Sequence, residues 1–194
     1  MTSGEEGPRH VVGIGGSAGG VEAFKQLIQE FQADSTAFVC LLHFPPDSVS
    51  NLDQILQSRT DLPVVRIQDG MRLKANVVYV MVPGHDIVVQ GGALHLKAFE
   101  GRPRWEAIDR FFFSLAKERA EQAVGVILSG TGKDGAVGLR SIRQAGGLTC
   151  VQEPASALYP QMPLAALPYA DVCLYPHELG EEIMKRLGIE PAAA

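Results

Sequence analysis

Short, continuously apolar runs alternate along this chain with segments whose apolar residues recur at helical spacing. The apolar runs cover residues 10–14, 37–42, 64–67, 124–128, 148–151 and 172–174. Segments with helical spacing lie between or after them, over 21–31, 52–56, 107–116, 137–142 and 178–187. Strands that are apolar on both faces are typical of a parallel sheet covered by helices on both sides. The pattern therefore predicts an α/β fold with a doubly wound, mostly parallel, Rossmann-like sheet.

One stretch in the middle of the chain departs from this alternation. Three short strand-like runs, at 77–82, 86–90 and 93–97, follow one another closely, and Pro83-Gly84 and Gly91-Gly92 separate them. Both dipeptides are strong turn signals. The second and third runs are therefore predicted to form an antiparallel hairpin.

The composition is that of an ordinary globular domain, with 46% hydrophobic and 20% charged residues among 194. The net charge of −5 and the lack of any long Lys/Arg cluster argue against a nucleic-acid partner. Residues 1–8 are polar and Gly-rich, so we expect a flexible tail followed by a single domain over 9–190. No apolar run approaches the roughly 20 residues of a membrane helix, and the N-terminus is no signal peptide. We expect no membrane insertion and a cytoplasmic location.

The three cysteines are too few, and odd in number, for a disulfide framework. Cys40, Cys150 and Cys173 each lie in a strand-like run, and no two of them share the spacing of metal ligands. We therefore expect buried, inert thiols and no metal site built from them.

The first apolar run leads into a glycine-rich turn, GIGGSAGG at residues 13–20. Gly13, Gly15 and Ala18 match the dinucleotide-binding pattern G-x-G-x-x-G/A. Gly15, Ser17 and Gly19 match the nucleophile elbow G-x-S-x-G. Both uses need glycine because the turn is sharp and the backbone approaches a ligand closely. A third interpretation makes Ser17 only the N-cap of the next helix. The turn alone leaves all three open.

The loop after the second apolar run bears on this choice. A dinucleotide site needs Asp or Glu at the end of the second strand to bind the ribose, and His43 occupies that place. A neutral histidine is the usual general base for a serine, because it titrates near the working pH. His43 thus favours Ser17 as a nucleophile, and the plain alternative is a histidine that merely ends the strand.

A third polar loop, SGTGKDG, follows the run at 124–128, and Asp134 stands just before a predicted helix. Asp is a favoured N-cap, so the plain interpretation is strong. A functional Asp134 would instead accept the other ring N–H of His43 and stabilise the imidazolium. The loop is no Walker A motif, because Asp134 follows Gly132-Lys133 where Ser or Thr is needed.

Ser17, His43 and Asp134 all end strands or open helices on the same edge of the predicted sheet, as a catalytic triad requires. The order Ser17, Asp134, His177 would suit an α/β-hydrolase. That fold needs several strands before its nucleophile, however, and only one precedes Ser17. A hydrolase of a different, doubly wound type fits better.

Several separated stretches of the chain are similar to the catalytic domain of CheB-type chemotaxis protein-glutamate methylesterases. They are GIGGSAGG at 13–20, LHFP at 42–45, DG at 69–70, VYV at 78–80, IDRFF at 108–112, VGVILSGTGKDGA at 124–136, GGLT at 146–149, QEP at 152–154 and MP at 162–163. The resemblance implies a doubly wound parallel sheet with an antiparallel hairpin. It also implies a nucleophilic serine, a histidine and an aspartate at the positions of Ser17, His43 and Asp134.

The activity implied by this resemblance is that of a serine hydrolase acting on γ-glutamyl methyl esters of chemoreceptor cytoplasmic helices. Its products would be glutamate and methanol, and deamidation of receptor glutamines would be a second activity. Such a mechanism needs no metal or cofactor. The oxyanion would be bound by N–H groups of the glycine-rich loops, those of Ala18 and Thr131.

The chain departs from the family pattern at both of these loop positions. The family more often has Ser-Thr-Gly-Gly where Ala18 follows the serine here, and Gly-Met-Gly where Thr131 stands here. Family members commonly carry an N-terminal receiver domain, and we expect none here because only about ten residues precede the first strand. A separate regulatory receiver, or a fused methyltransferase, is the protein partner that the resemblance suggests.

Two further functions stay open from the sequence. A catalytically weak regulatory or scaffold domain of a chemosensory-type pathway is favoured by Ala18, Thr131 and the expected lack of a receiver. A nucleotide binder would use the turn at 13–20, and the missing acid after the second strand argues against it.

Overall fold

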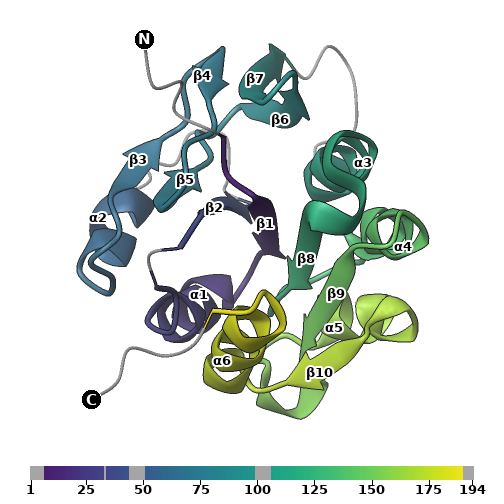
Figure 1. Cartoon of the computed structure of the whole chain (residues 1–194). Coiled ribbons are helices and arrows are strands. Elements are labelled where there is room, and N and C mark those ends of the chain that lie inside the picture. The colour runs from purple at the N-terminus through teal and green to yellow at the C-terminus, as the bar shows by residue number, and fades with distance from the viewer. Residues whose placement is uncertain (1–6, 33, 44–50, 99–105, 190–194) are drawn as a thin grey trace, which may run out of the picture.

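The chain folds around one seven-stranded sheet with helices on both faces, and a small second sheet packs beside it (Figure 1). This computed structural model describes residues 7–32, 34–43, 51–98 and 106–189, so most of the predicted tail lies outside the described residues. The strands are β1 His10–Gly16, β2 Thr36–Leu42, β3 Val64–Arg66, β4 Met71–Arg72, β5 Val77–Val80, β6 His85–Gln90, β7 Ala93–Ala98, β8 Ala123–Ile127, β9 Leu148–Gln152 and β10 Val172–Leu174. The α-helices are α1 Gly20–Ile28, α2 Leu52–Gln57, α3 Ala107–Arg119, α4 Ala136–Gln144, α5 Gln161–Ala166 and α6 Pro176–Arg186.

The large sheet has the strand order β10-β9-β8-β1-β2-β5-β3, and its neighbouring strands pair in parallel. The chain winds outward from β1 in both directions, first through β2 and later through β8. In such a sheet, ligands bind at the carboxyl ends of the strands, beside the point where the winding reverses. That point lies at the end of β1, between the loops that follow β2 and β8.

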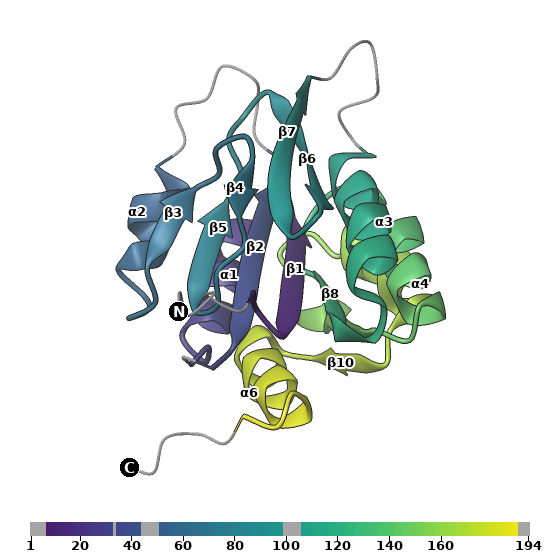
Figure 2. The same cartoon turned by 45° about the horizontal axis from the view of Figure 1, so that its top comes forward.

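The second sheet, of order β4-β7-β6, is antiparallel. Figure 2 shows its two longer strands standing over the face of the large sheet next to α3. The predicted hairpin is therefore confirmed as β6 and β7. The two-residue strand β4, which pairs with β7, is an element that the sequence pattern did not indicate.

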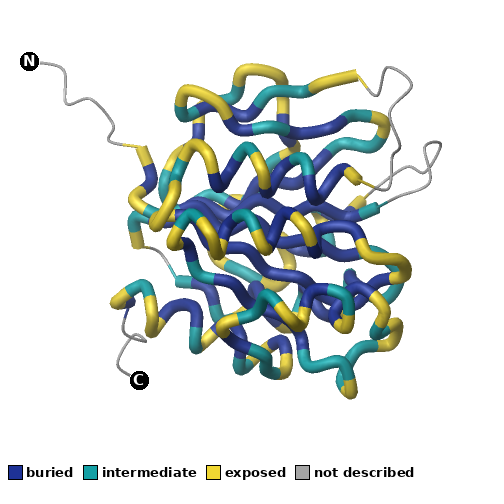
Figure 3. The backbone as a smooth tube through the Cα atoms, turned by 90° about the vertical axis from the view of Figure 1, so that its right-hand side faces the viewer, coloured by how far each residue is buried: buried dark blue, intermediate teal, exposed yellow. Residues whose placement is uncertain are grey.

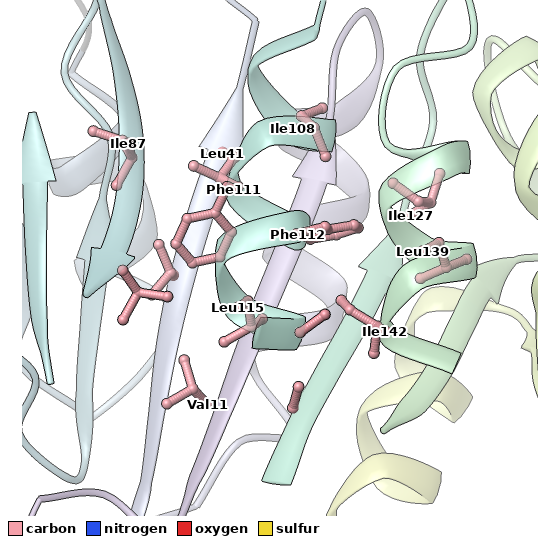
Figure 4. Close-up of a cluster of buried hydrophobic side chains, with 14 of the residues drawn as sticks. Val11, Leu41, Ile87, Ile108, Phe111, Phe112, Leu115, Ile127, Leu139 and Ile142 are labelled. Carbon is pink, nitrogen blue, oxygen red and sulfur yellow. The ribbon is translucent and has the colours of Figure 1, made fainter. Parts of the chain in front are cut away.

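Two apolar clusters fill the space on either side of the large sheet, and the strands between them are buried on both faces (Figure 3). On one face, α1 and α6 cover the sheet, with Phe24, Leu27 and Ile183 fully buried. On the other face, α3 and α4 cover it. Figure 4 shows Phe111 and Phe112 of α3 directed toward the strands and toward α4. This burial on both faces is why the strands read as continuous apolar runs.

The structure corrects the expected helices in three places. Helix α1 ends at Ile28, although apolar spacing continues to Phe31, because Phe31 still packs beyond the helix end and stacks on Phe38 at 4.1 Å between ring centroids. Val137, the first residue of the segment expected over 137–142, is 52% exposed and so lies outside the apolar face of α4. Helix α5 begins at Gln161, where the sequence pattern indicated no helix.

The thiols largely follow expectation. Cys40 and Cys150 are buried, and burial raises the pKa of both thiols far above their usual range. Cys173 is less buried than expected. Its Sγ donates to a carboxylate oxygen of Glu153 at 3.3 Å, and partial burial together with that carboxylate raises its pKa to about 11. All three thiols therefore stay protonated at neutral pH.

Among the helices of the described residues, not one has the length and apolar character that crossing a bilayer demands.

The close approach of α1 and α6 depends on Gly180. A Cβ atom at this position would lie 2.6 Å from the Cβ of Glu30 and 2.8 Å from the main-chain oxygen of Leu27. Both obstacles are main-chain atoms or are fixed to the main chain, so the two helices would have to separate.

We therefore expect Gly180→Ala to lower the free energy of unfolding by about 1–3 kcal/mol, despite the better helix propensity of alanine. Urea unfolding followed by circular dichroism measures this change. Gly7→Ala, at a position with no atom within 4 Å of the new Cβ, is the control and should match the native chain. Equal stability of both variants would show that α6 can shift freely over α1.

Candidate active site

Ser17 lies in the turn between β1 and α1, where the chain must reverse sharply. Gly19 adopts a φ of 73°, and a Cβ atom there would meet the hydroxyl oxygen of Ser129 at 2.7 Å, so only glycine fits. The main-chain N–H of Ser17 donates to the Ser129 carbonyl at 3.0 Å, and that of Gly20 donates to the Ser17 carbonyl at 2.8 Å. The turn thus leaves the Ser17 side chain partly exposed at the carboxyl end of β1.

Ser129 and Gly130, which follow β8, are fixed against this turn. The Ser129 hydroxyl donates to the Ala18 carbonyl at 2.9 Å and accepts the N–H of Tyr159 at 3.1 Å. The N–H of Gly130 donates to the Tyr159 carbonyl at 2.9 Å, and a Cβ on Gly130 would come within 2.9 Å of the Ser17 Cβ. Loops after β1, β8 and β9 therefore meet around Ser17.

His43 follows β2 directly, and its ring reaches across the end of β1 to the loop after β8. Its main-chain N–H donates to the Gly16 carbonyl at 3.2 Å. Its Nε2 lies 2.6 Å from Oδ2 of Asp134, an interaction between residues 91 positions apart. The sequence-based pairing of His43 with Asp134 is therefore found in the structure. Between described residues, no hydrogen bond joins the Ser17 hydroxyl to His43.

Asp134 does not cap the helix that follows it. Its side chain is 2% exposed, and the carboxylate accepts the main-chain N–H groups of Ile108 at 3.0 Å and Asp109 at 2.9 Å, in the first turn of α3. The carboxylate thus lies at the positive N-terminal end of α3 and caps that helix. The plain interpretation made Asp134 the N-cap of α4, the helix that follows it. Asp134 does cap a helix, but that helix is α3.

A second buried carboxyl group, that of Asp109, lies beside Asp134 and was not singled out as a site residue. It is 9% exposed and accepts the N–H of Gly138 at 2.6 Å. Burial, with help from the charge of Asp134, raises the pKa of Asp109 to about 6, against the lowering effect of the Gly138 hydrogen bond. In the sequence, Asp109 shows only as a polar residue on the apolar face of a predicted helix.

The other residues named from the sequence fall into two groups. Ala18 and Thr131 lie in the two loops on either side of Ser17, and within the described residues neither N–H donates to a protein acceptor. His177 lies near the start of α6 beside Tyr175, and Asp134 pairs with His43 instead. In the part of the chain that the structure describes, no three His, Cys, Asp or Glu side chains gather in a way that would hold a metal ion.

The chain is similar in sequence to known proteins of one family. A sequence model of the family described as CheB methylesterase matches residues 12–183. A protein-glutamate methylesterase/protein-glutamine glutaminase of Escherichia coli strain K12 is 33% identical over 172 residues, which are 84% of this chain and 48% of that protein. The protein of the same name from Bordetella parapertussis is 31% identical over 191 residues, 90% of this chain and 52% of that protein. The chain therefore spans about half the length of the curated relatives it matches.

A solved structure confirms the fold. The catalytic domain of a CheB methylesterase from Thermotoga maritima superposes with a TM-score of 0.79 at 24% identity, covering 93% of this chain and 99% of that one. The predicted doubly wound sheet with its antiparallel hairpin is thus the architecture of this structural relative.

The raised pKa of Asp109 makes the stability of the fold depend on pH. The folded chain holds this proton up to about pH 6, whereas the unfolded chain releases it near 3.8. Between these values the folded state binds more protons than the unfolded state, so this group stabilises the fold fully below pH 3.8 and loses that contribution as pH rises to 6.

We expect Asp109→Asn to abolish this loss, because asparagine still accepts the Gly138 N–H and carries no charge. Relative to the native chain, the variant should gain about 1–3 kcal/mol of unfolding free energy between pH 4 and pH 8. Urea unfolding at both pH values measures the difference. A constant difference between the two chains across this range would contradict the raised pKa.

Proposed function

We propose that this chain, which belongs to the CheB methylesterase family, hydrolyses γ-glutamyl methyl esters on protein side chains with Ser17 as its nucleophile. The observation that carries the proposal is the 2.6 Å contact between His43 and Asp134 at the sheet edge where Ser17 lies. A buried carboxylate, a histidine and a partly exposed serine at the ends of three neighbouring strands match the roles of acid, base and nucleophile.

The roles of the two histidine nitrogens follow from the contact with Asp134. Because the carboxylate accepts only, neutral His43 carries its proton on Nε2 and donates it to Asp134. Nδ1 is then the basic nitrogen left for Ser17. As the serine oxygen attacks the ester carbonyl, Nδ1 takes the serine proton, and Asp134 stabilises the imidazolium.

The tetrahedral intermediate carries a negative oxygen that needs hydrogen-bond donors. The N–H groups of Ala18 and Thr131 flank Ser17 and suit this role, since both belong to the main chain and survive the change of side chain at these two positions. His43 then protonates the departing methanol, which leaves an acyl-serine. Water, deprotonated by the same nitrogen, releases glutamate and restores Ser17.

The same sequence of steps would remove ammonia from a glutamine side chain. The curated relatives are named for both activities, and an amide differs from an ester here only in its leaving group. We propose deamidation as a second activity, and cytoplasmic helices of methylated chemoreceptors as the substrate. Regulation by a separate receiver domain or by a fused methyltransferase belongs to the same proposal.

Methanol release from a methylated receptor fragment tests the nucleophile. We expect the native chain to release methanol and Ser17→Ala to lose at least a thousandfold in rate, as removal of a triad nucleophile does. Ser141→Ala, at a serine on α4 whose hydroxyl donates to the Val137 carbonyl within its own helix, is the matched control and should keep the native rate.

Labelling with a fluorophosphonate separates a wrong substrate from an inactive domain, because only an activated serine reacts. Label on Ser17 without methanol release would leave the esterase chemistry in place and refute this substrate. Neither label nor methanol would indicate a regulatory or scaffold domain instead.

The general base predicts the pH dependence. Only neutral His43 can accept the proton of Ser17, so activity should fall on the acidic side of the pH profile as the imidazole takes up a proton. Initial rates of methanol release between pH 5 and 8.5 measure this limb. A flat profile over the whole range would exclude His43 as the base.

A further inference from the structure

Helices α3 and α4 each take an N-terminal cap from the other. Asp134, which stands just before α4, accepts two N–H groups of the first turn of α3. Asp109, in that first turn of α3, accepts the N–H of Gly138 in the first turn of α4 at 2.6 Å. Two buried carboxyl groups thus cross between two helix N-termini, and one of them contacts His43.

Asp109 is hydrogen-bonded to Asp134 and to Gly138, on either side of the turn that leads into α4. Its main-chain N–H donates to Oδ1 of Asp134, and its carboxyl group accepts from Gly138 four residues later. The helices also touch here, since a Cβ on Gly138 would lie 2.6 Å from the Phe112 Cβ and 3.0 Å from the Asp109 Cα. Any separation of α3 from α4 would therefore move Asp134 away from His43.

The charge of Asp109 is unfavourable where it lies. The side chain is buried, and the carboxylates of Asp134 and Glu106 both oppose its ionisation, so its pKa lies at about 6. An uncharged acceptor would serve Gly138 without that opposition. A carboxylate at this position adds negative charge close to Asp134 when His43 becomes positive.

We propose that Asp109 is a positioning residue of the esterase, which fixes Asp134 against His43 and supports the imidazolium through its charge. This inference rests on the proposed function. Asp109 acts through Asp134, and it takes no proton from the substrate.

Three variants of the full chain test the two parts of this role. Asp109→Ala removes both the acceptor and the charge, so we expect kcat for methanol release to fall about tenfold to a hundredfold with KM within twofold. Asp109→Asn keeps the acceptor, so kcat should fall less, and the acidic limb of the pH profile should move to lower pH by about half a unit. Gly138→Ala forces the helices apart and keeps both charges, so kcat should fall because Asp134 moves away from His43.

Asp171→Asn is the matched control. Asp171 also accepts a main-chain N–H, that of Thr149 at 3.1 Å, but it precedes β10 at the opposite edge of the sheet. We expect native kcat and a native pH profile for this variant. A fall in kcat without any movement of the limb in Asp109→Asn would reduce Asp109 to a structural cap and overturn the electrostatic part.

A spectroscopic measurement keeps this test separate from the proposed function. The ring N–H that His43 donates to Asp134 should give a far-downfield proton signal in the NMR spectrum of the native chain. We expect this signal to persist in Asp171→Asn and to weaken or move upfield in Asp109→Ala. Its unchanged presence in Asp109→Ala would overturn the proposal. If the native chain released no methanol, the proposed function would fail, and this signal would still decide whether Asp109 positions Asp134.

Discussion

The pairing of β1 with β2 on one side and β8 on the other is the constraint on which the site depends. Seven residue pairs join β1 to β2 and five join it to β8, all in parallel. Because the three strands run together, Ser17, His43 and the loop that carries Asp134 leave the sheet at the same edge. The parallel pairing of these strands thus sets where Ser17, His43 and the loop of Asp134 begin.

Helix N-termini supply the second constraint. The first turns of α3 and α4 hold main-chain N–H groups that have no partner within their own helices, and two buried carboxyl groups provide the acceptors. The electrostatic environment of His43 thus comes from helix capping. The two carboxyl groups near the imidazole of His43, those of Asp134 and Asp109, both lie where α3 and α4 cover the sheet.

Much of the fold could be predicted because its signal is local. A strand such as β2, buried on both faces, reads as an uninterrupted apolar run, and the Gly91-Gly92 turn marks the hairpin of β6 and β7. Helix α5 was missed because a helix of six residues, with Pro163 inside it, is too short to show a helical period. Phe31 suggested a longer α1 because packing against Phe38 keeps it apolar after the helix has ended.

The candidate site was predictable to the extent that its residues follow strands. Ser17 and His43 stand where strands end, and Asp134 lies in the loop between β8 and α4, so sheet topology places all three at one edge. Asp109 follows no strand, since it lies inside a helix and meets Asp134 only through the packing of α3 on α4. The sequence also could not tell which helix Asp134 caps, because that depends on a contact across 25 residues of chain.

Asp134 contacts His43 and also caps α3. A substitution of Asp134 therefore disturbs more of the structure than a substitution of Ser17. A chain that lacks the Ser17 hydroxyl keeps the caps of α3 and α4 and the contact between His43 and Asp134. Under the proposed function, its surface should therefore still recognise an ester-bearing protein that it cannot cleave. A chain that lacks the Asp134 carboxylate leaves two N–H groups of α3 without an acceptor and disturbs the surface itself. A variant at Ser17 is therefore the better choice for capturing an intact substrate. If a variant at Asp134 failed to capture one, that result would say little about the partner.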